Sequence, residues 1–361
     1  GAATTKKIVN RDIFSQFSAN LTFEQERDFK LGNALFRKLW VSSPSSTQAS
    51  DGLGPLYNAR SCQACHLKDG RGHPPRAGEG ASSMFLRLAR APETAEERAA
   101  VEDYLILNMP DPVYGEQLQE FAVPGLKAEG HLRIAYEEVP VTLSGGEVAS
   151  LRKPSYSVDE LGYGPLDKVT TLSPRVAPPM IGLGLIEAIE PADILANADP
   201  DDADGDGISG RPQLRRFESG AAPVLGRFGW KAGQPSLRQQ NAEAFANDMG
   251  LNSHLVPTDS CAPSQADCLA MPNGGEVEVS DSIMDSVLFY TRNLAVSARR
   301  NVDDPQVLKG KSLFHQANCQ GCHVPSFTTG NDAAEPELAN QTVRPYTDLL
   351  LHDMGPGLAD G

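Results

Sequence analysis

The stretch Cys62-Gln63-Ala64-Cys65-His66 and its later counterpart, Cys319-Gln320-Gly321-Cys322-His323, decide which fold and chemistry this chain can have. Both follow the pattern C-x-x-C-H, which is typical of covalent haem attachment. Two thiols three positions apart on one helical turn can each form a thioether with a vinyl group of the same haem. The adjacent histidine then lies beneath the iron as its proximal ligand. The motifs predict two covalently bound haem c groups, with His66 and His323 on the irons.

Two other uses of these cysteines fit the sequence less well. A thioredoxin-type C-x-x-C belongs at a helix N-terminus in a βαβ unit, and neither motif follows a strand pattern. A zinc site built from both pairs is chemically possible but leaves the two histidines unexplained. Because bacteria attach haem c outside the cytoplasmic membrane, we expect a periplasmic or surface-exposed protein.

Cys261 and Cys268 form the remaining cysteine pair, in a loop that contains Pro and Ser. An oxidising compartment favours a disulfide between them, and closing so short a loop stabilises the fold by about 2–3 kcal/mol. Two free thiols are the alternative.

The composition narrows the choice of partners. Forty-seven acidic and 32 basic residues give the 361-residue chain a net charge of −15. Such a surface repels phosphate backbones, so we expect no nucleic-acid partner. It would attract a basic redox protein, and a small periplasmic cytochrome or cupredoxin is the expected electron donor, although acidity also serves solubility alone.

We expect no membrane span and a processed chain. The most apolar stretch, 176–189, is interrupted by prolines and glycines, and no run reaches the roughly 18 apolar residues that cross a bilayer. The chain begins at Gly1 and contains no visible signal peptide.

Three helices can be placed from local signals. Thr22 with Gln25 has the pattern of a capping box at the start of the first helix. Asp304-Pro305 has the pattern of an N-cap followed by a first-turn proline. Apolar residues at helical spacing predict a further helix through 283–294. A Gly-x-x-Leu-Phe stretch precedes each haem motif, at 32–36 and 310–314, as in the N-terminal helix of a cytochrome c.

Residues 126–158 have a different pattern, with alternating and β-branched positions around the turn Gly145-Gly146, and predict a small β-hairpin. We therefore expect a mainly α protein with two cytochrome c-like haem domains. The N-terminal haem domain would cover residues 1–300, with the β insertion at about 126–158 and a calcium loop at about 199–210. The C-terminal haem domain would cover residues 301–361.

Asp202, Asp204 and Asp206 alternate in a D-x-D-x-D-G stretch that resembles the first half of a calcium-binding loop. Carboxylates at alternate positions of a tight loop converge on a hard cation. Gln213 stands where an EF-hand has its glutamate, so the loop is not a complete EF-hand. A solvated acidic turn is the alternative to a calcium site.

Four other residues are candidates for the haem chemistry. Glu187 is a candidate distal acid that moves peroxide protons, or a helix-end carboxylate. Trp230 is a candidate electron relay between the haems, or a core residue. His352 and Met354 are the nearest candidates for the sixth iron ligand of the second haem.

These segments together resemble a known family. The stretches that carry the resemblance are 51–55, 58–72, 173–175, 182–189, 201–210, 226–231 and 345–355. They are similar to the bacterial di-haem oxidoreductases often labelled thiol oxidoreductases, which are related to di-haem cytochrome c peroxidases and MauG-like enzymes.

The resemblance implies roles for the two haems. Peroxide would react at the haem of His66, and electrons would arrive through the haem of His323. An aromatic residue between the haems, here Trp230, and a nearby calcium ion also belong to the pattern. Family members continue beyond Ala359 with an HDGRA-like segment, so we expect the C-terminal haem domain to be incomplete in this chain.

The sequence therefore predicts an enzyme, a peroxidase-like di-haem oxidoreductase. Two alternatives remain open. One is a non-catalytic electron-transfer cytochrome in which both irons keep six ligands. The other is an oxidoreductase of thiols or sulfur compounds. The only support for this alternative is the name given to the similar family.

Overall fold

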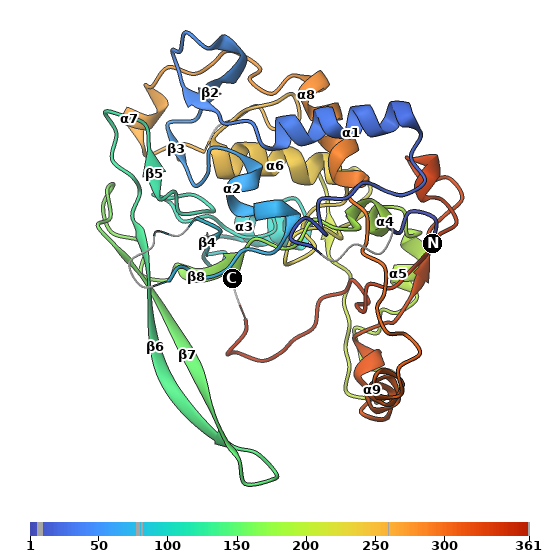
Figure 1. Ribbon diagram of the computed structural model, residues 1–361. Coiled ribbons are helices and arrows are strands. Elements are labelled where there is room, and N and C mark those ends of the chain that lie inside the picture. Colours follow the sequence, from blue (N-terminus) through green and yellow to red (C-terminus); the bar gives the residue numbers. More distant parts are fainter. Residues whose placement is uncertain (6–9, 77–79, 81, 259, 360–361) are drawn as a thin grey trace.

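Three helices form the main core of the computed structural model, which describes residues 1–5, 10–76, 80, 82–258 and 260–359. They are α1 (Phe23–Phe36), α6 (Leu237–Met249) and α8 (Asp281–Arg292). Figure 1 shows α1 and α8 side by side, with α6 beneath them. Phe29 and Phe36 of α1 are buried there against Met284, Val287 and Tyr290 of α8. This cluster supports the segment that carries the first haem motif.

The expected helix signals are confirmed. The Thr22 hydroxyl accepts the backbone N–H of Gln25, and the Gln25 side chain accepts the backbone N–H of Thr22. Asp304 caps α9 (Pro305–Gln316) by accepting the backbone N–H of Gln306 at 2.8 Å. The helix expected through 283–294 is α8, which begins and ends two residues earlier.

Within the residues that the structure describes, the strands form six separate two-stranded sheets. The pairs are β1 (Val41–Ser42) with β2 (Asp51–Leu53), β3 (Leu56–Tyr57) with β5 (Phe121–Ala122), β4 (Met84–Ala89) with β8 (Thr171–Val176), β6 (His131–Thr142) with β7 (Val148–Asp159), β9 (Leu214–Arg215) with β10 (Val224–Leu225), and β11 (Phe327–Thr328) with β12 (Thr342–Val343). The shorter helices are α2 (Cys62–Cys65), α3 (Ala95–Glu102), α4 (Leu183–Glu187), α5 (Pro191–Leu195) and α7 (Ala266–Leu269).

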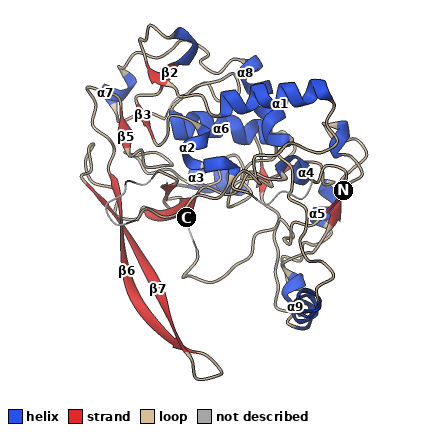
Figure 2. Cartoon of the chain, viewed as in Figure 1, coloured by secondary structure: helices blue, strands red, loops and turns tan. Residues whose placement is uncertain are grey.

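The expectation of a mainly α fold is wrong. Helices account for only 25% of the chain and strands for 19%. Figure 2 shows how much of the backbone between the helices is loop. Several strands pair with strands that are distant in sequence, such as 84–89 with 171–176. Local periodicity carries no information about such pairings, so the sequence underestimates them.

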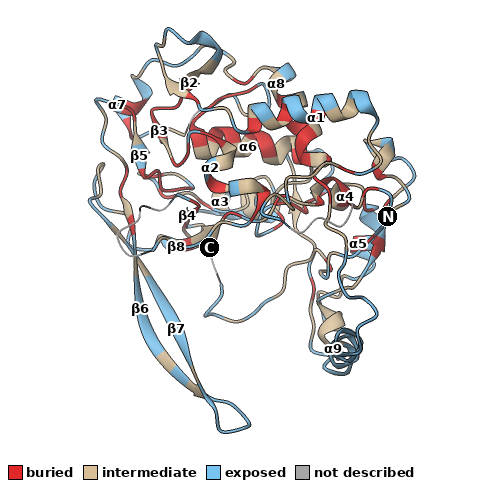
Figure 3. Ribbon diagram, viewed as in Figure 1, coloured by how far each residue is buried: buried red, intermediate tan, exposed pale blue. Residues whose placement is uncertain are grey.

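The expected hairpin at about 126–158 is present, with its two strands over 131–142 and 148–159. β6 and β7 pair over all twelve positions, from His131 with Asp159 to Thr142 with Val148. The ribbon projects from the body of the molecule (Figure 1), and most of its surface is exposed (Figure 3).

A second apolar cluster joins the C-terminal segment to the middle of the chain. Leu185, Ile189 and Ile194 of the α4–α5 region pack with Phe327 and Leu338. The division of the chain at residue 300 stays a prediction, and the last two residues of the expected C-terminal domain lie outside the described residues. Within the described part, no helix is long and apolar enough to cross a membrane.

Candidate haem sites

The first haem motif opens onto a cavity of about 380 Å³. The short helix α2 presents Cys62 and Cys65 to this cavity, and His66 follows at its end. Helix α6 lines it with Leu237, Asn241, Phe245 and Asp248, among others. A cavity of this size lies within the range of cofactor sites in proteins.

His66 is held in the form that an iron ligand needs. Its Nδ1 lies 2.8 Å from the carbonyl oxygen of Pro178. A carbonyl can only accept, so Nδ1 must carry the proton and Nε2 keeps its lone pair. Burial lowers the pKa of His66, which favours the same neutral imidazole at neutral pH. The imidazole therefore suits a proximal ligand.

The two thiols beside His66 are not activated. Burial, reinforced by the carboxylate of Asp248, raises the pKa of Cys62 and of Cys65 to about 12. Reactive cysteines and thiolate metal ligands need the opposite environment. The surroundings of this pair therefore argue against both the thioredoxin-type and the zinc interpretation.

The cavity wall suits a porphyrin, which has an apolar ring and two anionic propionates. Phe36, Met180 and Phe245 supply apolar surface, and Arg87 and Arg175 supply cationic groups. The residues present therefore fit a haem attached to Cys62 and Cys65.

The second motif repeats the histidine geometry in a more open setting. His323 Nδ1 lies 3.0 Å from the carbonyl oxygen of Tyr346, which fixes the same tautomer as at His66. Phe314 of α9 lies edge-on to the ring of Tyr346 and 6.4 Å from that of His323. Cys319 and Cys322 are only partly buried, and α9 has no buried residue. This site is an exposed counterpart of the first.

The two candidate sixth ligands behave differently. Asp348 donates its backbone N–H to the carbonyl of Cys322 at 3.0 Å, and its carboxylate lies 2.6 Å from Nε2 of His352. His352 therefore lies near the second motif but is engaged with Asp348. Met354 is 69% exposed. A sixth-ligand role stays a prediction for both.

Trp230 lines the first cavity and also reaches the surface. Its indole N–H donates to the carbonyl of Val176 at 2.7 Å, and the guanidinium of Arg71 lies 5.6 Å from its ring. The residue is 49% exposed, so it is not a core tryptophan. An electron-relay role remains a prediction, and this position is compatible with it.

Glu187 lies apart from the lining of that cavity, at the end of α4. One carboxylate oxygen accepts the backbone N–H of Leu237 at 2.7 Å, and the other lies 2.6 Å from Nε of Arg292. Both oxygens are thus engaged in holding α4, α6 and α8 together. The geometry matches the helix-end alternative, and the distal-acid role stays a prediction.

Sequence reasoning did not single out the charged residues that do line the cavity. Asp248 is the main example, and burial raises the pKa of its carboxyl. Gln117 donates to it at 2.9 Å. Nothing local marks Asp248 in the sequence, because only the packing of α6 beside α2 brings it to the site. Arg175 could have been found, since it lies in the 173–175 stretch that carries the family resemblance.

The aspartate loop is partly assembled. Carboxylate oxygens of Asp199, Asp202 and Asp204 lie within 4.8 Å of one another. Asp206 is not part of this group, and its carboxylate accepts the backbone N–H of Ile208 at 2.8 Å. Asp199, which the sequence analysis left outside the ligand set, takes the expected place of Asp206. Calcium binding here stays a prediction.

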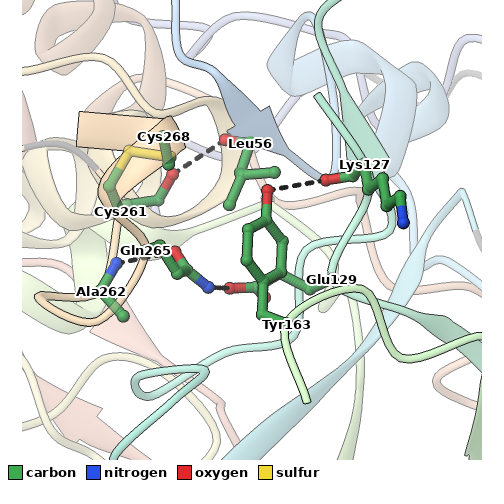
Figure 4. Close-up of a disulfide and its surroundings, with 9 residues drawn as sticks. Leu56, Lys127, Glu129, Tyr163, Cys261, Ala262, Gln265 and Cys268 are labelled. Carbon is green, nitrogen blue, oxygen red and sulfur yellow. Dashed lines mark hydrogen bonds between the residues drawn. A yellow bond between two sulfur atoms is a disulfide. The ribbon is translucent and has the colours of Figure 1, made fainter. Parts of the chain in front are cut away.

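Cys261 and Cys268 lie within bonding distance, with their sulfur atoms 1.98 Å apart. The loop between them carries Gln265, which donates to the buried carboxylate of Glu129 at 2.5 Å (Figure 4). Gln119 donates its backbone N–H to the other oxygen of Glu129 at 2.6 Å. This loop therefore anchors the base of the β6–β7 ribbon.

The comparison with known families agrees with this arrangement. A family model described as "Di-haem oxidoreductase, putative peroxidase" matches residues 1–361, the whole chain. The protein belongs to this di-haem oxidoreductase family. Neither a curated protein nor a solved structure matched the chain.

Proposed function

We propose that this protein is a periplasmic di-haem c-type oxidoreductase that reduces hydrogen peroxide at the haem of His66. The observation that carries the proposal is the first cavity, where two thiols and a histidine with a free Nε2 share one wall. A haem held there supplies the redox chemistry of peroxide reduction. Membership of a di-haem oxidoreductase family supports the same class of reaction.

The chain's own residues would bind and orient the reactants. Cys62 and Cys65 hold one haem by thioether bonds, and Pro178 fixes the orientation of His66 through its carbonyl. Arg87 and Arg175, which line the cavity, would neutralise the propionates of a haem bound there. The apolar wall excludes bulk water, which strengthens each polar interaction inside the cavity.

The more exposed second site suits electron input. Cys319, Cys322 and His323 would hold a haem c close to the surface, where a small cytochrome or cupredoxin can approach the acidic molecule. Electrons would then pass to the first haem, with Trp230 as the candidate relay. Calcium bound at Asp202 and Asp204, together with Asp199, would hold the loop that precedes Ile208.

That loop touches the second haem motif. The methyl end of Ile208 lies so near Gly321 that a Cβ there would come within 2.4 Å of it. A cation in the aspartate loop would therefore also steady the turn that carries Cys319 and Cys322.

Optical and EPR spectra of the calcium-loaded holoprotein test the proposal. They are recorded fully oxidised and half-reduced, with and without one equivalent of hydrogen peroxide. We expect a high-spin ferric signal in at least one state that peroxide removes. The paired variants C62S/C65S and C319S/C322S should each retain one covalent haem, and only the first pair should abolish the response. Two low-spin haems unchanged by peroxide in both states would leave the electron-transfer cytochrome as the function.

A further inference from the structure

The β6–β7 ribbon has one face that packs on the body and one that does not. Leu132, Ile134, Tyr156 and Val158 join the cluster around Leu86. Side chains alternate along a strand and cross-strand partners share a face. The even-numbered residues of both strands therefore form the inner face, toward the body. The odd-numbered residues, from 133 to 143 and from 147 to 157, form the outer face, which points away from the body at the base of the ribbon, where the contacts with the body lie.

Both edges of the ribbon are protected against an added strand. Leu143 donates its backbone N–H to Glu147 across the turn at 2.8 Å, so odd-numbered N–H groups point to the partner strand. Even-numbered ones point outward. Pro140 of β6 and Pro154 of β7 take outward positions and have no N–H to offer. Association through the edges is thereby disfavoured, which leaves the outer face.

The residue pairs on the outer face change from charged to apolar toward the tip of the ribbon. Glu137 pairs with Lys153, followed toward the tip by Val139 with Leu151 and Val141 with Ala149. Leu151 is 55% exposed, so apolar surface faces solvent here. Within the described residues no ion pair joins Glu137 to Lys153. A two-stranded ribbon is at best marginally stable alone in water, and no third strand from the described part of the chain pairs with this one.

We propose that the outer face binds the same face of a second copy of this chain, about a twofold axis parallel to the ribbon. That rotation places β6 of one copy opposite β7 of the other at equal height. Glu137 then faces Lys153 of the second copy, and Val139 faces Leu151. The face is therefore complementary to itself in charge and in apolar surface.

The packing of the ribbon on the body and the distribution of charge both agree with a second copy of this chain as the binding partner. Each body packs on the inner face at the base of its own ribbon, so among the described residues the outer face near Val139 and Leu151 is not covered by the body. The chain carries a charge of −15, but residues 131–159 hold four acids and three bases. The ribbon is thus a region where two copies can meet with little repulsion.

Sedimentation velocity of the haem-loaded protein over a concentration series tests the proposal. We expect a dimer for the wild type. L151S should raise the dissociation constant about tenfold or more, because it removes apolar surface at the centre of the contact. V148S is the matched control, since Val148 lies at the tip of the inner face and is 61% exposed. It should leave the dimer intact.

A charge exchange tests the pairing itself. K153E places Glu137 opposite a like charge at two equivalent points and should weaken the dimer about tenfold or more. E137K/K153E restores opposite charges across the axis and should recover the dimer. A monomeric wild type would overturn the proposal, as would a dimer that L151S and K153E leave unchanged. Binding of a different protein by a monomeric chain through this face would overturn it too.

Discussion

At the scale of single residues, Glu187 offers the clearest choice between structure and catalysis. Its carboxylate satisfies Arg292 and the backbone of Leu237, and the Glu187 and Arg292 side chains are largely buried. E187A would leave Arg292 with Glu335 as its remaining carboxylate and would remove the acceptor of the Leu237 N–H, so we expect a loss of about 2–3 kcal/mol in the free energy of unfolding. Urea denaturation measures this loss, while peroxide turnover per folded molecule should hardly change. A turnover loss of about a hundredfold or more with unchanged stability would instead establish a distal acid.

Glu129 predicts a pH dependence of stability. Burial raises its pKa in the folded protein to about 8, from the usual 4.5. Between these values the folded chain holds a proton that the unfolded chain releases. Stability therefore falls as pH rises through this window, by up to about 1.4 kcal/mol per unit.

The variant E129Q isolates this effect. Its side chain cannot ionise, so the free energy of unfolding should fall less steeply between about pH 4.5 and 8, by the contribution that Glu129 makes in the wild type. The amide satisfies Gln119 and Gln265 less well than the carboxyl group does, but this does not change the slope. Equilibrium unfolding at a series of pH values gives both slopes. Equal slopes in the two proteins would show that Glu129 is ionised in the folded state.

At the scale of elements, the two Gly-x-x-Leu-Phe helices differ at equivalent glycines. A Cβ at Gly32 of α1 would come within 2.2 Å of the carbonyl oxygen of Ser286 in α8, whereas at Gly310 of α9 it would meet nothing within 4 Å. G32A should therefore cost about 1–3 kcal/mol by forcing the helices apart. G310A should stabilise its helix by about 1 kcal/mol. Thermal unfolding compares the two, and equal effects would contradict the close crossing of α1 and α8.

The aspartate loop predicts a response to calcium. If the ion binds only the folded chain, a concentration a hundred times the dissociation constant adds about 2.7 kcal/mol of stability. Chelation should lower Tm accordingly, and D202N/D204N should remove the difference between calcium-loaded and chelated protein. D206N is the comparison, because Asp206 lies outside the assembled group. An identical Tm with and without calcium would make the loop a solvated acidic turn.

At the scale of the whole molecule, the sequence predicted local features and missed most of their assembly. The capping box at Thr22, the start of α9 and the β6–β7 hairpin depend on neighbouring residues, and these were confirmed. The mainly α fold was wrong in part because pairings such as that of β4 with β8 join segments 82 to 92 residues apart. Local patterns contain no trace of such a contact.

The candidate sites divide in the same way. C-x-x-C-H is a local motif, so both candidate haem-attachment segments could be located from the sequence alone. Residues that approach the cavity from other elements could not, and Asp248 of α6 is the clearest case. Glu187 was chosen for its apolar neighbourhood, but its orientation depends on Arg292, which lies about a hundred residues further along the chain.

The β6–β7 ribbon is anchored at its base. Its tip should therefore open locally at a lower free energy than the helical core. The half nearer the body is held by the cluster around Leu86 and by Glu129. Among the described residues, the half nearer the tip is held by cross-strand contacts alone. Amide hydrogens near Val139 and Leu151 should therefore exchange with deuterium by local fraying, long before those of α6 and α8, which require global unfolding. In the proposed dimer this fraying would be suppressed as protein concentration rises, so that exchange at the tip would report association while exchange in the core would not.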